Sequence, residues 1–182
     1  MDEDQDVIRR VLDGEVESFR WLVRRYERPL FGLIRNLVSD AHDGEDVAQE
    51  VFLTAYRRLR SYDPTQGTFS TWLLTIARNK CLNALKKRRP VVLDPLPERL
   101  APRTPDAELA EVEWFRRLDQ ALDALPFAQK SAFVLAEIQG RSLEEIARIE
   151  GVPVGTVKSR LGRAKEKLRS LLRPVEQPDV RP

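Results

Sequence analysis

The stretch from Ser142 to Leu168 constrains the fold of this chain more than any other, because its pattern predicts two short helices joined by a tight turn. Ser142 is a favourable N-cap residue, and Glu145, three positions later, completes a capping box. Gly151 ends the first helix, since glycine adopts a left-handed backbone at the least cost, and Pro153 suits the first turn of the second helix. The stretch therefore predicts a helix-turn-helix.

The second helix of this motif has one apolar and one polar face. At about 100° per residue, the apolar stripe contains Val157, Leu161, Ala164, Leu168 and Leu171. The opposite face contains Gly155, Thr156, Ser159, Gly162, Arg163 and Glu166, and it is flanked by Lys158 and Arg160. A solvated amphipathic helix is the alternative interpretation. The tight turn and the excess of basic residues favour a helix that lies in the major groove of DNA.

Charge is strongly segregated along the 182 residues, although the formal net charge is only +2. No acidic residue lies between Pro64 and Leu93, a segment with six lysines and arginines. Residues 151–173 contain one acidic and seven basic side chains. The N-terminus and the middle of the chain carry the compensating acids. Two basic regions separated by an acidic one predict two contacts with a polyanion.

The chain has a single cysteine, Cys81, which leaves no partner for an internal disulfide and predicts a reducing compartment. No apolar run approaches the ~20 residues that span a bilayer. The acidic N-terminus does not resemble a signal peptide. We therefore expect a soluble, cytoplasmic protein without membrane insertion.

The remaining chain reads as a succession of amphipathic helices without an alternating strand pattern, which predicts an all-α fold. Helices are expected at residues 2–13, 16–37, 43–60, 70–87, 107–125 and 129–139, and Pro29 should kink the second of them or divide it in two.

The segment from Pro90 to Pro105 contains five prolines and predicts a stiff, extended linker, and the tail after Arg173 is expected to be disordered. We expect two small helical domains with few contacts between them. An inhibited arrangement in which the domains pack together is the alternative.

Groups that could support catalysis are few. His42, the only histidine, lies near several carboxylates that could help it to ligate a metal: Asp43, Glu45, Asp46 and Glu50. An acidic first helical turn, which the helix dipole favours, explains this cluster more simply. The sequence has no Walker loop, nucleophile elbow or glycine-rich phosphate cradle. We therefore expect no catalytic residues, no metal and no cofactor, and a helical nucleic-acid enzyme is disfavoured.

The segment from Gly67 to Arg89 combines aromatic, amide and basic side chains. Phe69 and Trp72 begin a helix whose later turns carry Arg78, Asn79, Lys80, Asn83, Lys86 and Lys87. Such groups suit exposed bases and a phosphate backbone. By spacing alone, Trp72 fits a core position better than a stacking platform. The run from Lys86 to Arg89 repels itself unless a polyanion meets it.

Three segments of the chain, Asp43 to Leu59, Phe69 to Arg89 and Gly140 to Leu168, resemble extracytoplasmic-function (ECF) sigma factors of bacterial RNA polymerase in sequence, order and spacing. The resemblance implies sigma region two at residues 1–90, a linker at 91–110, sigma region four at 111–173 and a tail at 174–182.

The resemblance also implies three functional surfaces. Docking on the polymerase clamp would involve Asp46, Gln49 and Glu50. Recognition and melting of the minus-ten element would involve Phe69, Trp72, Arg78, Asn79, Lys80, Asn83, Lys86 and Lys87, with Asn79 near a flipped base. Reading of the minus-thirty-five element would involve Thr156, Lys158, Ser159, Arg160 and Arg163.

A protein of this kind directs promoter-specific initiation by binding core polymerase, reading one promoter element as duplex and opening the other. Its implied partners are core polymerase, promoter DNA in duplex and single-stranded form, and an anti-sigma factor. Two weak DNA-binding modules gain effective concentration when polymerase joins them, so catalysis by the chain itself is not needed. A helix-turn-helix regulator that acts without polymerase is the alternative. Such regulators usually dimerise to match two half-sites, and no dimerisation helix is evident.

Overall fold

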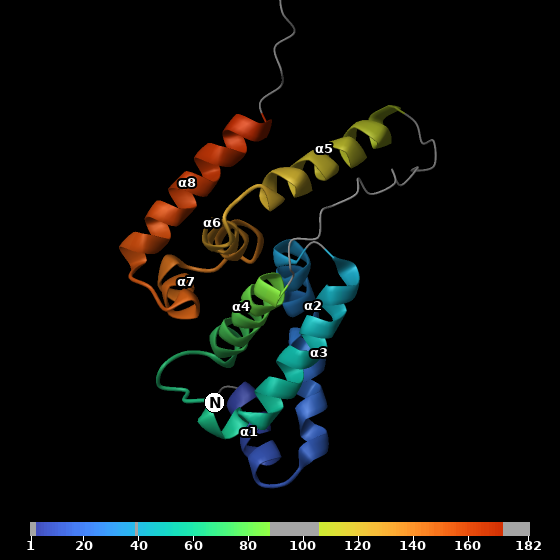
Figure 1. Cartoon of the computed structure of the whole chain (residues 1–182). Coiled ribbons are helices and arrows are strands. Elements are labelled where there is room, and N and C mark those ends of the chain that lie inside the picture. The colour runs from blue at the N-terminus through green and yellow to red at the C-terminus, as the bar shows by residue number, and fades with distance from the viewer. Residues whose placement is uncertain (1–2, 39, 88–105, 173–182) are drawn as a thin grey trace, which may run out of the picture.

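A computed structural model describes residues 3–38, 40–87 and 106–172, and every regular element within these ranges is helical (Figure 1), which confirms the all-α prediction. The elements are α1 (Glu3–Leu12), η1 (Val16–Ser18), α2 (Phe19–Leu37), α3 (Ala41–Arg57), η2 (Leu59–Ser61), α4 (Phe69–Lys87), α5 (Asp106–Asp123), α6 (Phe127–Phe133), η3 (Val134–Ile138), α7 (Leu143–Glu150) and α8 (Val154–Leu172). The elements η1 and η2 are 3₁₀ turns, and η3 is a π-helical turn. Residues 88–105, most of the expected linker, and the tail from residue 173 lie outside the described residues.

Two helix boundaries depart from the sequence-based expectation for local reasons. Helix α3 begins at Ala41, earlier than expected, because the Asp40 carboxylate accepts the backbone N–H groups of His42 at 2.9 Å and Asp43 at 3.3 Å. Helix α2 runs unbroken past Pro29, so the expectation that proline divides it is wrong. The loss of one backbone hydrogen bond is tolerated there because the helix buries five apolar side chains, Leu22, Leu30, Leu33, Ile34 and Leu37.

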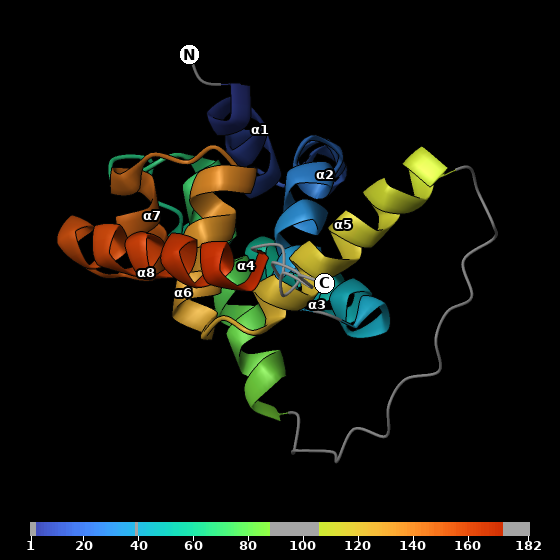
Figure 2. The ribbon, with the colours of Figure 1, turned by 90° about the horizontal axis from the view of Figure 1, so that it is seen from above.

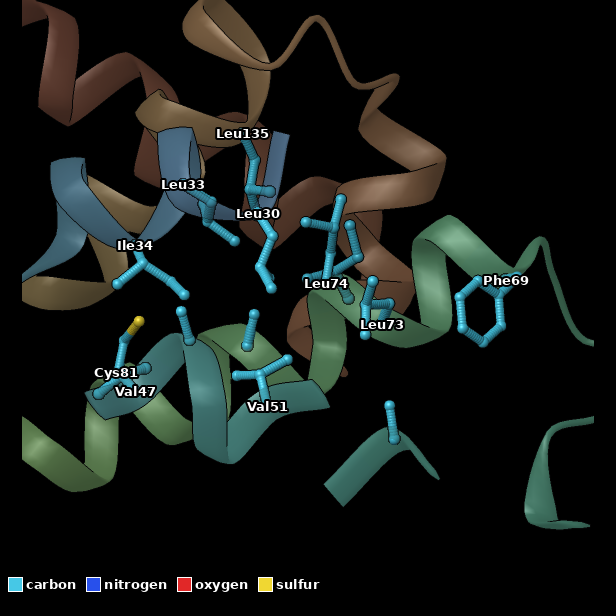
Figure 3. Close-up of a cluster of buried hydrophobic side chains, with 14 of the residues drawn as sticks. Leu30, Leu33, Ile34, Val47, Val51, Phe69, Leu73, Leu74, Cys81 and Leu135 are labelled. Atoms are coloured by element: carbon cyan, nitrogen blue, oxygen red, sulfur yellow. The ribbon is translucent and has the colours of Figure 1, made fainter. Parts of the chain in front are cut away.

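Helices α1 to α4 form an N-terminal unit around a dense apolar core (Figure 3). Helix α4 lies beside α2 and α3 and contributes Phe69, Leu73, Leu74 and Cys81 to this core. Burial raises the pKa of the Cys81 thiol to about 12, which fits a structural cysteine.

Helices α7 and α8 form the predicted helix-turn-helix. The Ser142 hydroxyl accepts the Glu145 backbone N–H at 3.2 Å, and the Glu145 carboxylate accepts the Ser142 N–H at 3.0 Å, so the capping box is confirmed. Gly151 ends α7 with φ of 65°, in the left-handed region. Helix α5 packs on α8 through a small separate core, from which Leu171 is excluded at 40 % exposure, contrary to the predicted stripe.

The N-terminal unit and the helix-turn-helix pack directly on each other. Helix α7 lies beside α4 (Figures 1 and 2), and Leu135 of η3 points toward Leu30 and Leu33 of α2 (Figure 3). Ile146 and Ile149 of α7 belong to the same buried cluster as these residues. The expectation of few contacts between the domains is therefore wrong, and the packed alternative is the observed arrangement. It arises because the apolar side chains of α4 are not confined to the face that meets α2 and α3.

Candidate nucleic-acid and polymerase interfaces

Helix α8 presents the first basic surface. Its apolar side anchors it through buried Val157 and Ala164. On the opposite side Lys158, Ser159 and Arg163 are exposed. Thr156 lies half-buried in the first turn, where its carbonyl oxygen accepts a hydrogen bond of 3.0 Å from the Ser159 hydroxyl. Thr156, Lys158, Ser159 and Arg163 are four of the five residues predicted to contact the minus-thirty-five element. These four residues lie together on the solvent side of the helix.

Arg160, the fifth residue predicted for this surface, is engaged elsewhere. Its Nη1 atom donates to Glu150 Oε2 at 2.6 Å, and the Glu150 side chain is fully buried. The structure therefore separates Arg160 from the exposed face. Sequence reasoning missed Glu150, and its position as the last residue before the Gly151 turn gave no functional signal.

Helix α4 presents the second surface. At about 100° per residue, Trp72, Asn79, Asn83 and Lys86 lie within about 60° of one another around the helix. Asn79, Asn83 and Lys86 are exposed, and so is Lys87 beside them. This part of the predicted minus-ten surface is continuous.

The aromatic residues at the start of α4 have different environments. The Trp72 ring is half-buried and lies 5.6 Å from the ring centroids of both Tyr62 and Phe69. Phe69 itself is 1 % exposed and belongs to the core, so no base can stack on it in this structure. Phe69 instead supports Trp72 from within, and Tyr62 fixes the loop by donating to the Gly67 carbonyl at 3.1 Å.

The Arg78 side chain faces Glu150 of α7 and is also hydrogen-bonded to its neighbour Asn79. Its Nε atom lies 3.8 Å from Glu150 Oε1, and its guanidinium lies 5.3 Å from the centroid of the Phe127 ring. Its Nη1 atom donates to Asn79 Oδ1 at 3.2 Å. Only 11 % of its side chain is exposed, and this burial lowers the pKa of Arg78. Helix α7 therefore covers Arg78.

A groove between α3 and α4 brings the predicted docking residues next to the minus-ten residues. Its acidic side contains Asp43, Asp46 and Glu50, and its basic side contains Lys80, Lys86 and Lys87, with Asn83 beside them. Lys80 Nζ lies 2.9 Å from Glu50 Oε2, and this contact lowers the pKa of the Glu50 carboxyl. Gln49 is exposed on the same helix as Asp46 and Glu50. The acidic and basic surfaces are thus contiguous.

In the ranges that the structure describes, no three or more His, Cys, Asp or Glu side chains group in a way that could hold a metal ion. Among those same residues, no helix is both long enough and apolar enough to cross a membrane.

A helix-turn-helix and a second helix with exposed amide and basic side chains define a helical nucleic-acid-binding protein. Residues 22–91 match Sigma-70 region 2, and residues 115–168 match Sigma-70, region 4. The chain is 36 % identical to the RNA polymerase sigma-H factor of Pseudomonas aeruginosa, with 96 % of each chain covered. It is also 36 % identical to the ECF RNA polymerase sigma-E factor of Haemophilus influenzae, with 94 % of this chain and 96 % of that one covered. The chain therefore belongs to the ECF sigma factors of the sigma-70 family.

Solved structures agree with this assignment. CnrH, in complex with the cytosolic domain of CnrY, superposes with a TM-score of 0.73 and 29 % identity, and the match covers 94 % of this chain and 97 % of that one. The sigma factor RpoE of Bartonella quintana, in complex with the anti-sigma factor NepR, gives a TM-score of 0.67 at 24 % identity over 88 % of this chain and 99 % of that one. At that identity the second likeness supports the fold alone.

Proposed function

We propose that this sigma factor directs promoter-specific initiation through three surfaces, on α3, α4 and α8. The observation that carries the proposal is that sigma regions two and four are both present and that each contributes an exposed polar and basic helix face. Region two would extend over residues 1–90, a linker over 91–110, region four over 111–173 and a tail over 174–182.

Helix α8 would read the minus-thirty-five element as duplex. A helix in the major groove reads base edges with side chains near its N-terminal end. Lys158, Ser159 and Arg163 have the exposed positions that this role requires, and half-buried Thr156 lies beside them in the first turn. Arg160 could join them only after it separates from Glu150.

Helix α4 would open the minus-ten element. Extruding a base from the stack costs a few kcal/mol, which must be offset by its capture. Asn79 supplies an exposed amide for the edge of that base, and Lys86 and Lys87 supply charges for the strand backbone. Trp72 lies two helical turns before Asn79 on the same side.

Helix α3 would dock on core polymerase. Asp46, Gln49 and Glu50 are exposed on one side of this helix and favour a basic partner surface. The docked polymerase would bring regions two and four to one promoter and raise their effective concentration there. The energy for opening would come from binding, so the sigma factor would act without catalysis and in the cytoplasm, where polymerase transcribes.

An anti-sigma factor is the further partner that we propose. CnrH, which is similar to this chain over nearly its whole length, was solved in complex with the cytosolic domain of CnrY. A partner of that kind would regulate this sigma factor by controlling access to its polymerase and DNA surfaces.

Transcription of genomic DNA by purified core polymerase tests the proposal directly. We expect the wild-type chain to produce transcripts with discrete 5′ ends that share upstream sequence elements, whereas core polymerase alone gives none. Asp46→Arg should lose these transcripts while it keeps its helix content, because the added charge would repel a basic surface. A helix-turn-helix regulator would instead bind DNA without polymerase and would leave core polymerase unable to initiate at specific sites.

A further inference from the structure

One buried carboxylate contacts an arginine from each of the two DNA-binding units. Glu150, at the end of α7, has a side chain with no exposed surface. Its Oε2 atom accepts from Arg160 of α8 at 2.6 Å, and its Oε1 atom lies 3.8 Å from Nε of Arg78 in α4. Arg160 belongs to the same unit as Glu150, whereas Arg78 reaches it across the boundary between the units.

Other contacts at this boundary accompany the ion pair. Nη2 of Arg141, just before α7, donates to the Ser70 hydroxyl of α4 at 2.8 Å. The Phe127 ring of α6 packs against the Arg78 guanidinium. Arg78 is therefore held by region four from two directions, and the α4 side that carries it is covered.

The two ion pairs of Glu150, with Arg160 and with Arg78, differ in their hydrogen bonding. Arg160 makes a short hydrogen bond to Glu150. In contrast, Glu150 Oε1 and Arg78 Nε are both buried without a hydrogen-bond partner among the described residues. When two buried charges attract each other without a direct hydrogen bond, their attraction offsets little of the hydration free energy lost on burial. The Glu150–Arg78 pair between the units is thus weaker than the Glu150–Arg160 pair, and the Arg78 guanidinium is hydrated again when the units separate.

We propose that the packed arrangement is an autoinhibited state of the free sigma factor, in which Glu150 holds one arginine from each DNA-binding surface. The inference rests on the DNA-binding roles proposed above for α4 and α8. Separation of the units would expose Arg78 and the covered side of α4 to single-stranded promoter DNA. It would also leave Arg160 with the only contact to Glu150.

Two matched variants of the full chain test whether the Glu150 contact with Arg78 and Arg160 holds the two units together, a contact that we call the lock. Glu150→Gln removes the charge with little change in shape, and it leaves Arg78 buried without a carboxylate. Glu144→Gln makes the same chemical change on the exposed side of α7. In small-angle X-ray scattering without polymerase or DNA, we expect Glu150→Gln to have a larger radius of gyration than the wild type, and Glu144→Gln to match the wild type.

DNA binding supplies the second readout. Glu150→Gln should bind a single-stranded minus-ten oligonucleotide at least about 5-fold more tightly than Glu144→Gln, a factor typical of coupling between two sites. Because both variants lose one negative charge, comparing them cancels the general effect of that loss on DNA affinity. Expansion without tighter binding would contradict autoinhibition. A compact Glu150→Gln would contradict the lock, even if its duplex binding increased, since Glu150 would then only position Arg160.

A third variant covers the case in which Glu150→Gln loses its helical circular dichroism. Ser70→Arg places a second positive charge against Arg141 and leaves Glu150 intact, so it should also increase the radius of gyration. A Ser70→Arg chain as compact as the wild type would overturn the proposal. Because scattering uses neither polymerase nor promoter, these outcomes are independent of the transcription test of the proposed function.

Discussion

At the residue scale, Arg160 and Arg163 show that two arginines on one helix can have separate roles. They lie three positions apart on α8, yet Arg160 contacts a buried carboxylate and Arg163 is exposed. Among the described residues no carboxylate lies within ion-pair distance of Arg163, which leaves its guanidinium available to DNA. Charge alone therefore does not identify the residue that reads bases.

This contrast predicts that two alanine substitutions change the free energy of unfolding by different amounts. Arg160→Ala should lower the free energy of unfolding by about 1–3 kcal/mol, because Glu150 keeps only its weaker contact with Arg78. Arg163→Ala should change it by less than about 0.5 kcal/mol. Chemical denaturation of the two variants measures both values. If Arg160→Ala lost no more stability than Arg163→Ala, the contact between Arg160 and Glu150 would contribute nothing to the free energy of unfolding.

The same pair predicts a difference in specificity. Arg163→Ala should lose about 1–3 kcal/mol of discrimination at one position of the minus-thirty-five element, as expected for a lost base contact. Binding of holoenzyme to a panel of single-base promoter variants measures this loss. If all variants weaken equally and the salt dependence falls, Arg163 contacts a phosphate instead.

Cys81 gives a prediction for the core. The thiolate is the reactive form of cysteine, and burial raises the pKa of this thiol to about 12, so little thiolate exists at neutral or mildly alkaline pH. A disulfide reagent such as DTNB at pH 8 should therefore modify Cys81 only as fast as the native core opens. Immediate, complete labelling of the folded chain would contradict the burial of Cys81.

At the element scale, α8 combines a buried apolar side with an interior residue of low helix propensity. Gly162 lies in the middle of the helix, and a Cβ atom built there would meet nothing within 4 Å. Packing therefore does not require glycine at this position. The remaining physical reason for a small residue is close approach of the helix backbone to a ligand.

Gly162→Ala should accordingly stabilise the free chain while it weakens duplex binding. The gain expected from helix propensity is about 1 kcal/mol. Thermal unfolding measures the gain, and binding of holoenzyme to minus-thirty-five duplex measures the loss. Stabilisation with unchanged binding would remove close DNA approach as the reason for Gly162.

At the scale of the whole molecule, local features were predictable and distant contacts were not. The capping box at Ser142 and the turn at Gly151 depend on neighbouring residues, so the sequence pattern predicts the helix-turn-helix well. The exposed faces of α4 and α8 follow from helical periodicity in the same way. By contrast, the Arg141–Ser70 hydrogen bond joins residues 71 positions apart, and the periodicity of one helix contains no information about it.

The displaced site residues share this cause. Phe69 looked like a partner for bases because aromatic groups suit both stacking and packing, and only the surrounding helices decide between them. Arg78 and Arg160 looked like free DNA ligands because Glu150, which holds them, lies on another helix. Packing between helices, within a unit for Phe69 and Arg160 and between the units for Arg78, thus changes the environment of the predicted residues without changing which helices carry them.

The central claim is that this sigma factor makes core polymerase open promoter DNA, and permanganate footprinting tests it most directly. On a promoter identified by the genomic transcription experiment, wild-type holoenzyme should make thymines near the start site reactive. Asn79→Ala should still bind core polymerase and the closed promoter but should lose most of this reactivity, because the extruded base is no longer captured. A template with a pre-melted bubble should then restore transcription by Asn79→Ala. Absence of reactive thymines with the wild-type holoenzyme bound at the promoter would contradict the claim.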